Sequence, residues 1–134
     1  MPTLAPASTG AVAQELVSLC RAGRNLDAIA KLYSTKIVSI EPVGDGTMPA
    51  EMTGINAIRQ KNERWYASYE VHDVEVNGPF VGEHQFAVQY DFDTTFKPTG
   101  RRVRMSEMAL YTVQDGKIVR EQFFYNPPPR SDPS

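Results

Sequence analysis

The stretch Arg101–Gln114, RRVRMSEMALYTVQ, decides the fold because its residues largely alternate between polar and apolar side chains. Period-two alternation predicts a β-strand with one buried face. Glu107 interrupts the apolar half of this pattern, between Met105 and Ala109. Burying a carboxyl group costs free energy unless the group is paired, protonated or beside a wet cavity. The stretch therefore predicts a long, half-buried strand and a pocket next to Glu107.

The chain before this stretch supplies a first partner strand. Residues 84–96 alternate in the same way, and a turn at residues 97–100, Lys-Pro-Thr-Gly, leads into Arg101. If that turn is a four-residue loop, Tyr90 lies opposite Glu107. This register keeps the apolar residues of both strands on one face, whereas a slip of one residue would move them to opposite faces.

The chain after it, residues 117–125, supplies a second partner strand. The residues Gln114-Asp-Gly116 predict a three-residue hairpin loop with glycine in the left-handed conformation. That loop length places Glu107 opposite Phe123, and Ala109 opposite Glu121. A second acidic residue, Glu121, is therefore expected on the same inner face as Glu107.

The outer face of the last two strands is apolar at several positions, which are Met108, Leu110, Ile118 and Phe124. An exposed apolar patch indicates a partner surface, and a homodimer through this face is the simplest expectation. The basic residues Arg101, Arg102 and Arg104 are expected to form cross-strand charge pairs with acidic residues such as Asp93.

The first half of the chain has helical periodicity. Apolar residues at helical spacing predict helices over about Val12 to Arg21, from Asn25 onward, and over about Ile55 to Ser68. In the third helix, Asn62 and Trp65 belong to the stripe that should close the sheet. The fold class is therefore α+β, with helices first and a four-stranded antiparallel meander after them.

The segments between these elements are shorter. Residues 36–41 predict a strand that Pro42 stops, residues 44–53 predict a loop, and residues 71–76 predict a strand that ends at the turn Asn77-Gly78. Residues 1–10 and 127–134 are expected to be disordered, and residues 11–126 to form a single domain.

Composition excludes several classes of function. The 134 residues carry a formal net charge of −2, which gives no footprint for nucleic acid or an anionic membrane. No apolar run approaches the roughly 20 residues needed to span a bilayer, and no signal pattern opens the chain, so a cytoplasmic location is the default expectation. The two histidines and Cys20 are not at ligand spacing, so no metal is expected.

The candidate pocket residues follow from the inner face. The tyrosines Tyr90, Tyr111 and Tyr125 are expected around Glu107 and Glu121, and these phenols or helix residues could simply hydrogen-bond the two acids. Alternatively, Glu107 is a pocket acid whose pKa desolvation raises. The residues expected to line the pocket and bind substrate are Asn62, Trp65, Met105, Tyr111, Glu121, Phe123 and Tyr125.

These features together resemble the SnoaL-like branch of the nuclear-transport-factor-2-like superfamily, over about residues 11–126. The segments that carry the resemblance are Asn25–Tyr33, Ile40–Pro42, Thr53–Ile58, Glu107–Tyr111 and Asp115–Ile118. The resemblance implies a cystatin-like cone, in which a curved antiparallel sheet wraps around N-terminal helices and encloses one internal pocket. The superfamily includes cyclases, isomerases, dehydratases, epoxide hydrolases and binding modules, so the fold alone does not select an activity.

The resemblance also implies roles for particular residues. Glu41 looks like the carboxylate base of the ketosteroid isomerases, and Glu107 looks like their protonated acid, which donates a hydrogen bond to an oxyanion. The tyrosine of the first isomerase helix falls near Val17, so Tyr90 is the candidate for a supporting phenol.

The predicted function is a cofactor-independent cyclase or isomerase that acts on a small hydrophobic carbonyl compound, with Glu41, Glu107 and Tyr90 as catalytic residues. The alternative is a non-catalytic module that holds a small apolar molecule in the same cavity.

Overall fold

The computed structural model describes residues 7–44 and 48–126. The predicted C-terminal tail, residues 127–134, and residues 1–6 lie outside the described residues. In the described part of the chain, three helices and a six-stranded sheet form, which confirms the α+β class. No helix in that part is long and apolar enough to cross a membrane.

The helices follow the predicted periodicity. α1 spans Thr9–Arg21, α2 spans Asn25–Leu32 and α3 spans Ile55–Ser68. α1 begins inside the stretch that was expected to be disordered, because the Ser8 side chain accepts a hydrogen bond from the Ala11 N–H and caps the helix.

The sheet contains more strands than the predicted meander. Its strands are β1 (Tyr33–Ile40), β2 (Glu51–Thr53), β3 (Tyr69–Val81), β4 (Gln85–Phe96), β5 (Arg101–Gln114) and β6 (Lys117–Phe124). Their order is β2-β1-β6-β5-β4-β3. β1 runs parallel to β6 and the other neighbours are antiparallel. β1 is thereby joined to the end of the meander, which brings the segment around Ser39 next to Glu121.

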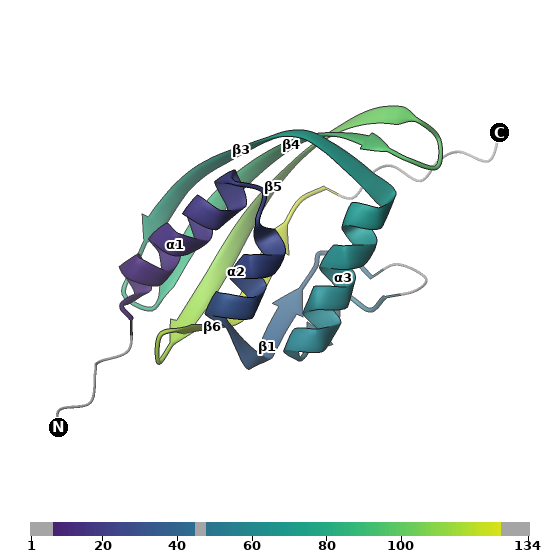
Figure 1. The fold of residues 1–134 in the computed structure, drawn as a ribbon. Helices are drawn as coiled ribbons and strands as arrows, with labels where there is room; N and C mark the ends of the chain where they lie inside the picture. The colour runs from purple at the N-terminus through teal and green to yellow at the C-terminus, as the bar shows by residue number, and fades with distance from the viewer. Residues whose placement is uncertain (1–6, 45–47, 127–134) are drawn as a thin grey trace, which may run out of the picture.

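The sheet is curved and unclosed, and the helices lie on its concave side (Figure 1). α1 packs against β3, β4 and β5, whereas α3 contacts β1 and β2 at one edge of the sheet and β3 at the other. α3 therefore contacts both edge strands of the sheet, β2 and β3. This arrangement gives the inner face two distinct coverings, α1 over one region and α3 over the other.

The hairpin of β4 and β5 has the predicted register. Tyr90 lies opposite Glu107, Phe92 opposite Met105, and Phe96 opposite Arg101. Two constraints agree here, because a four-residue loop and the apolar alternation both require this pairing.

The predicted register of β5 and β6 is wrong. Glu121 lies opposite Tyr111 rather than Ala109, and Phe123 lies opposite Ala109 rather than Glu107. The loop has two residues, Asp115 and Gly116, both with positive φ (52° and 75°), and a register shift follows where the pairing passes from Val113 to Thr112. Together the shorter loop and this irregularity displace the pairing by an even number of residues, so Glu121 stays on the inner face.

The same irregularity corrects the predicted outer face. Ile118 is fully buried, although it was expected to point outward. Met108 and Phe124 do remain substantially exposed, at 40% and 48%. The apolar patch is therefore smaller than the alternation predicts, because the register shift near the turn exchanges the faces of Ile118 and Val119.

Two further segments differ from the predictions. β3 continues through Asn77-Gly78, where a turn was predicted, and Gly78 with φ of 120° lies in an interruption of the pairing between Asn77 and Phe80. β2 forms within the predicted loop and pairs with the end of β1. The part of that predicted loop at residues 45–47 lies outside the described residues.

Candidate functional site

The acidic residues on the inner face meet under α3. We call Glu41, Glu107 and Glu121 the carboxyl cluster, and the side chain of Lys61 from α3 lies among them. Glu41 directly follows β1, Glu107 comes from β5 and Glu121 from β6. The parallel pairing of β1 with β6 and the placement of α3 over β1 bring these distant segments together.

Glu121 is the buried member of the cluster, with 2% of its surface exposed. Its carboxylate accepts hydrogen bonds from the Tyr33 hydroxyl and, at 2.9 Å, from Ser39 Oγ. Burial raises the pKa of Glu121, whereas the Lys61 charge and these two hydrogen bonds oppose the shift. The sequence left open whether Tyr90, Tyr111 or Tyr125 hydrogen-bonds Glu121, and the phenol that does so is instead Tyr33.

Lys61 connects the members of the cluster. Its Nζ donates to Ser39 Oγ at 2.7 Å and to Glu41 Oε1 at 3.0 Å, and lies 4.0 Å from Glu121 Oε1. The ammonium also lies over the Phe123 ring, 5.2 Å from its centroid. Lys61 was not among the predicted site residues, although its spacing from the buried Ile58 was a signal, since positions i+3 and i+4 share one helix face.

Glu107 is partly buried on the inner face. Desolvation raises the pKa of its carboxyl to about 7, and the charges of Glu41 and Glu121 add to the effect, whereas Lys61 opposes it. A carboxyl group with this pKa exchanges its proton near neutral pH, which suits general acid–base chemistry.

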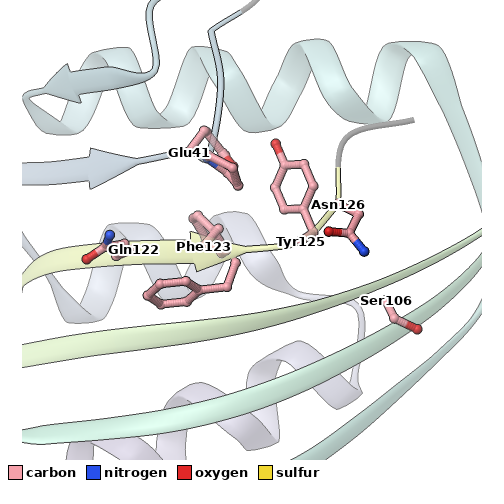
Figure 2. A pocket seen from close by; sticks show the side chains of 8 residues that line it. Glu41, Ser106, Gln122, Phe123, Tyr125 and Asn126 are labelled. Atoms are coloured by element: carbon pink, nitrogen blue, oxygen red, sulfur yellow. The ribbon is translucent and has the colours of Figure 1, made fainter. Parts of the chain in front are cut away.

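Of the carboxyl cluster, Glu41 lines a hollow of about 420 Å³ at the end of β1 and β6, whereas Glu107 and Glu121 are not among its lining residues. Its lining residues are Glu41, Pro42, Ser106, Gln122, Phe123, Phe124, Tyr125 and Asn126. Figure 2 shows Glu41 at the end of β1 and the Tyr125 ring rising from the end of β6 on the side of α3. The hollow therefore combines one acidic group with aromatic surface. The enclosed internal pocket implied by the resemblance stays a prediction.

The predicted supporting phenol, Tyr90, lies in a different region. Its hydroxyl is 2.8 Å from the Tyr111 hydroxyl and 3.8 Å from Cys20 Sγ, in a buried group that α1 covers. Tyr90 stands opposite Glu107 across the strands, but its hydroxyl is hydrogen-bonded to Tyr111. Burial raises the pKa of both tyrosines well above the ordinary value. Tyr90 and Tyr111 are therefore joined by a buried hydrogen bond, and the role of Tyr90 as a donor to substrate stays a prediction.

The other predicted lining residues lie either in contacts within the fold or at the hollow. The Asn62 side chain donates to the Ile58 carbonyl of its own helix at 3.0 Å. Trp65 stacks on Tyr69 and lies against Phe92. Met105 is partly buried opposite Phe92. Of the predicted substrate-binding residues, Phe123 and Tyr125 therefore line the hollow.

Charged side chains outside the carboxyl cluster form ordinary surface ion pairs. Arg102 forms an ion pair with Asp93 at 2.6 Å, which is one of the expected cross-strand charge pairs, although Arg104 is the residue directly opposite Asp93 in the register. Within residues 7–44 and 48–126, no group of three or more His, Cys, Asp or Glu side chains is arranged to hold a metal ion.

Comparison with known proteins identifies the family. A family model of the SnoaL-like domain matches residues 7–125. A solved structure from Mesorhizobium loti, named a candidate SnoaL-like polyketide cyclase with carbohydrate phosphatase as a second label, is 39% identical. The match covers 89% of this chain and 100% of that one, with a TM-score of 0.83. No curated protein matches the chain.

More distant structures share the fold alone. A candidate SnoaL-like polyketide cyclase from Jannaschia sp. CCS1 is 16% identical with a TM-score of 0.73, over 94% of this chain and 92% of that one. A protein of unknown function with a cystatin-like fold from Xanthomonas campestris is 14% identical with a TM-score of 0.72, over 90% and 92%. The chain belongs to the SnoaL-like domain family of the nuclear-transport-factor-2-like superfamily.

Proposed function

We propose that the chain is a cofactor-independent enzyme of the cyclase or isomerase type that moves a proton on a small hydrophobic carbonyl compound. The observation that carries the proposal is the pairing of two unlike carboxyl groups at one site. Burial raises the pKa of Glu107 to about 7, and Glu41, which lines the hollow and adds to that rise through its charge, forms an ion pair with Lys61. An acid and a base at one site are the groups that such a reaction needs.

In the proposed reaction, Glu41 removes a proton from the carbon beside the substrate carbonyl and becomes neutral. The electron pair of the broken C–H bond moves to the carbonyl oxygen and gives an enolate. Neutral Glu107 donates a hydrogen bond to that oxygen, or transfers its proton to it, and so stabilises the charge that develops. In an isomerisation, the first carbonyl re-forms and the proton returns from Glu41 to a different carbon of the substrate. In a cyclisation, the enolate carbon bonds to the carbon of a second carbonyl, the π electrons of that carbonyl move to its oxygen, and this oxygen takes the proton from Glu41.

The aromatic lining supports the substrate class. Phe123 and Tyr125 line the hollow beside Glu41, and the ammonium of Lys61 is already engaged by Glu41 and Ser39. A ligand carboxylate would face the acidic cluster without a free cation, whereas an uncharged apolar ligand would bury its surface on the rings.

The test is deuterium exchange on a panel of hydrophobic ketones, followed by NMR as a function of pH. Exchange by the wild-type protein should fall as pH rises through about 7, because Glu107 loses its proton there. Glu107→Gln should reduce the rate roughly 100- to 10,000-fold and remove that limb of the profile. The exposed Glu51 gives a matched control, since Glu51→Gln should change neither. An unchanged profile in Glu107→Gln would remove Glu107 from the mechanism.

A second candidate function is non-catalytic binding of a small apolar molecule in the same hollow. The observation that favours it is the 3.0 Å ion pair, which occupies the Glu41 carboxylate with Lys61. Under this proposal Glu41→Ala changes the affinity for an apolar fluorescent probe, and no ketone exchanges deuterium faster with the protein than in buffer. Exchange that Glu41→Ala abolishes would exclude the binding module.

The homodimer also remains a proposal, supported by the exposed Met108 and Phe124 on the outer face of β5 and β6. Sedimentation velocity of the wild type and of Met108→Glu tests it. A dimer in the wild type that becomes a monomer in the variant is the expected result, and a monomeric wild type would refute it.

A further inference from the structure

Lys61 lies at the centre of the hydrogen bonds that join the carboxyl cluster. Its Nζ contacts Ser39 and Glu41 directly, and Ser39 Oγ in turn donates to Glu121 at 2.9 Å. The Tyr33 hydroxyl donates to the other oxygen of Glu121. A continuous path of hydrogen bonds therefore runs from the buried Tyr33 through Glu121, Ser39 and Lys61 to Glu41 at the hollow.

The chemistry of these groups fixes the direction of each hydrogen bond. An ammonium group only donates, so Ser39 Oγ accepts from Lys61 and uses its own hydrogen to donate to Glu121. Glu121 accepts from both Ser39 and Tyr33, and these hydrogen bonds, together with the Lys61 charge, oppose the rise in its pKa that burial causes. Glu41 accepts from Lys61 at 3.0 Å, in an ion pair. The contacts of Lys61 thus reach two of the three carboxyl groups, directly or through Ser39.

Glu107 differs from Glu41 and Glu121, because the charge of Lys61 influences it electrostatically without a hydrogen bond or a shared bridging residue. Lys61 lowers the pKa of Glu107, but desolvation and the charges of Glu41 and Glu121 outweigh this effect. Glu107 shares its surroundings with groups from three elements. These groups are Ser39 and Glu41 from the β1 segment, Glu121 from β6 and Lys61 from α3, with Tyr33 hydrogen-bonded to Glu121. When several like charges share one site, the proton goes to the member with the weakest compensation.

We propose that Lys61 is a positioning residue that divides the three carboxyl groups into fixed roles. It holds Glu41 as the ionised base at the hollow, anchors Glu121 through Ser39, and leaves Glu107 as the group that takes up and releases the proton. The assignment of base and acid rests on the proposed function, whereas the distribution of protons is a property of the free protein. The two are therefore tested by separate measurements.

The experiment follows the side-chain carboxyl ¹³C shifts of Glu41, Glu107 and Glu121 by NMR from pH 4 to pH 9. Lys61→Met removes the charge and keeps a similar length, so the Glu107 midpoint should rise from about 7 by roughly half a unit to one unit. Lys61→Arg should restore most of the wild-type midpoint, because the charge returns. Lys36 is an exposed lysine of β1, and Lys36→Met should leave the midpoint unchanged.

A second variant keeps the proposal falsifiable if Lys61→Met does not fold, which circular dichroism would show. Glu41→Gln removes one of the charges that raise the pKa of Glu107, so the Glu107 midpoint should fall. A Glu107 midpoint that stays the same in Lys61→Met, or in Glu41→Gln, overturns the proposal. So does a wild-type protein in which Glu41, rather than Glu107, is the carboxyl group that titrates near neutral pH.

The outcome for the proposed function is read separately, from deuterium exchange on the ketone panel. If the midpoints move as expected, Lys61 has the proposed role whether or not any ketone exchanges. If ketones exchange with a limb near pH 7 and Lys61→Met leaves both that limb and the midpoint in place, Lys61 does not order the cluster and the proposed function stands without it.

Discussion

Two regions of the inner face lie side by side on the same sheet and differ in what covers them. Under α1, the hydroxyl groups of Tyr90 and Tyr111 bond to each other at 2.8 Å, and Cys20 lies 3.8 Å from Tyr90. Under α3, Glu121 accepts from Tyr33 and Ser39, and Lys61 adds a positive charge. Both regions bury tyrosines, but only the region under α3 holds charges.

The covering helix explains the difference. The face of α1 that packs on the sheet consists of small and apolar side chains, among them Val12, Leu16 and Val17. The corresponding face of α3 has Ile58 followed by the polar pair Lys61 and Asn62. A buried carboxyl group is tolerated only where partners are supplied or where it is protonated. Under α3, Glu121 of β6 has such partners, whereas the pKa of Glu107 of β5 is raised to about 7. The comparison teaches that the sheet supplies the acids and the helix decides whether they can stay charged.

The largest expected effect is on the region under α3. Glu121→Ala should lower the free energy of unfolding by about 3 to 5 kcal/mol, because Tyr33 and Ser39 lose their acceptor and Lys61 loses one of its two acidic neighbours. Urea unfolding at pH 7 measures this change, with Glu51→Ala at an exposed position as the control. A loss below about 1 kcal/mol would show that the buried carboxylate is not stabilised by these contacts.

The next effect is a pH dependence that the region under α1 should lack. The pKa of Glu107 is raised from 4.5 to about 7 in the folded chain. The unfolded state therefore holds fewer protons than the folded state between these values, and the stabilising contribution is lost as pH rises through about 7. The loss should be roughly 2 to 3 kcal/mol, less than the full shift implies because Glu107 is partly exposed.

Urea unfolding of wild type and Glu107→Gln across pH 4.5 to 8.5 measures this loss. The variant should have a flatter profile and exceed the wild type in stability at the alkaline end. Parallel profiles would mean that Glu107 titrates alike in the folded and unfolded chains.

A matched pair of substitutions sharpens the comparison between the regions. Tyr33→Phe removes a hydrogen bond to a carboxylate and should cost about 1.5 to 3 kcal/mol. Tyr111→Phe removes a hydrogen bond between two phenols and should cost about 0.5 to 1.5 kcal/mol, since its stacking on Phe86 is retained. Denaturant midpoints of both variants under one condition give the ratio. Equal costs would contradict the view that only one region is charged.

The smallest effect is expected on the outer face, which serves as the exposed reference. Arg102→Ala breaks the ion pair with Asp93, and water and salt already screen that pair. Its urea midpoint should match the wild type at 0.15 M and at 1 M salt. A measurable, salt-dependent loss would show that the outer face contributes more than an ordinary solvated surface.

Local sequence was sufficient for part of this structure. The helix over Ile55–Ser68 and the register that places Tyr90 opposite Glu107 were both predictable. For the helix the spacing of apolar residues was enough, and for the hairpin two independent constraints agree, namely strand alternation and turn length. The unusual position of Glu107 was also evident, because a single acid in an apolar alternation is conspicuous.

Tertiary structure alone decided the second hairpin. A displacement by an even number of residues leaves the alternation intact, so the pattern could not distinguish the predicted partner of Ala109, Glu121, from the observed partner, Phe123. The left-handed conformations of both Asp115 and Gly116, and the irregularity after them, select the observed pairing.

The composition of the site was decided in the same way. The sequence marked Glu41, Glu107 and Glu121 as candidate acids, and the fold brought all three to one place. The sequence did not mark Lys61 or Tyr33 as site residues. The helical pattern is satisfied whether Lys61 or its neighbour Asn62 faces the sheet, and whether Tyr33 or its neighbour Leu32 does so. Their role depends on β1 pairing with β6 and on α3 packing over β1, and such contacts between distant segments have no local signature.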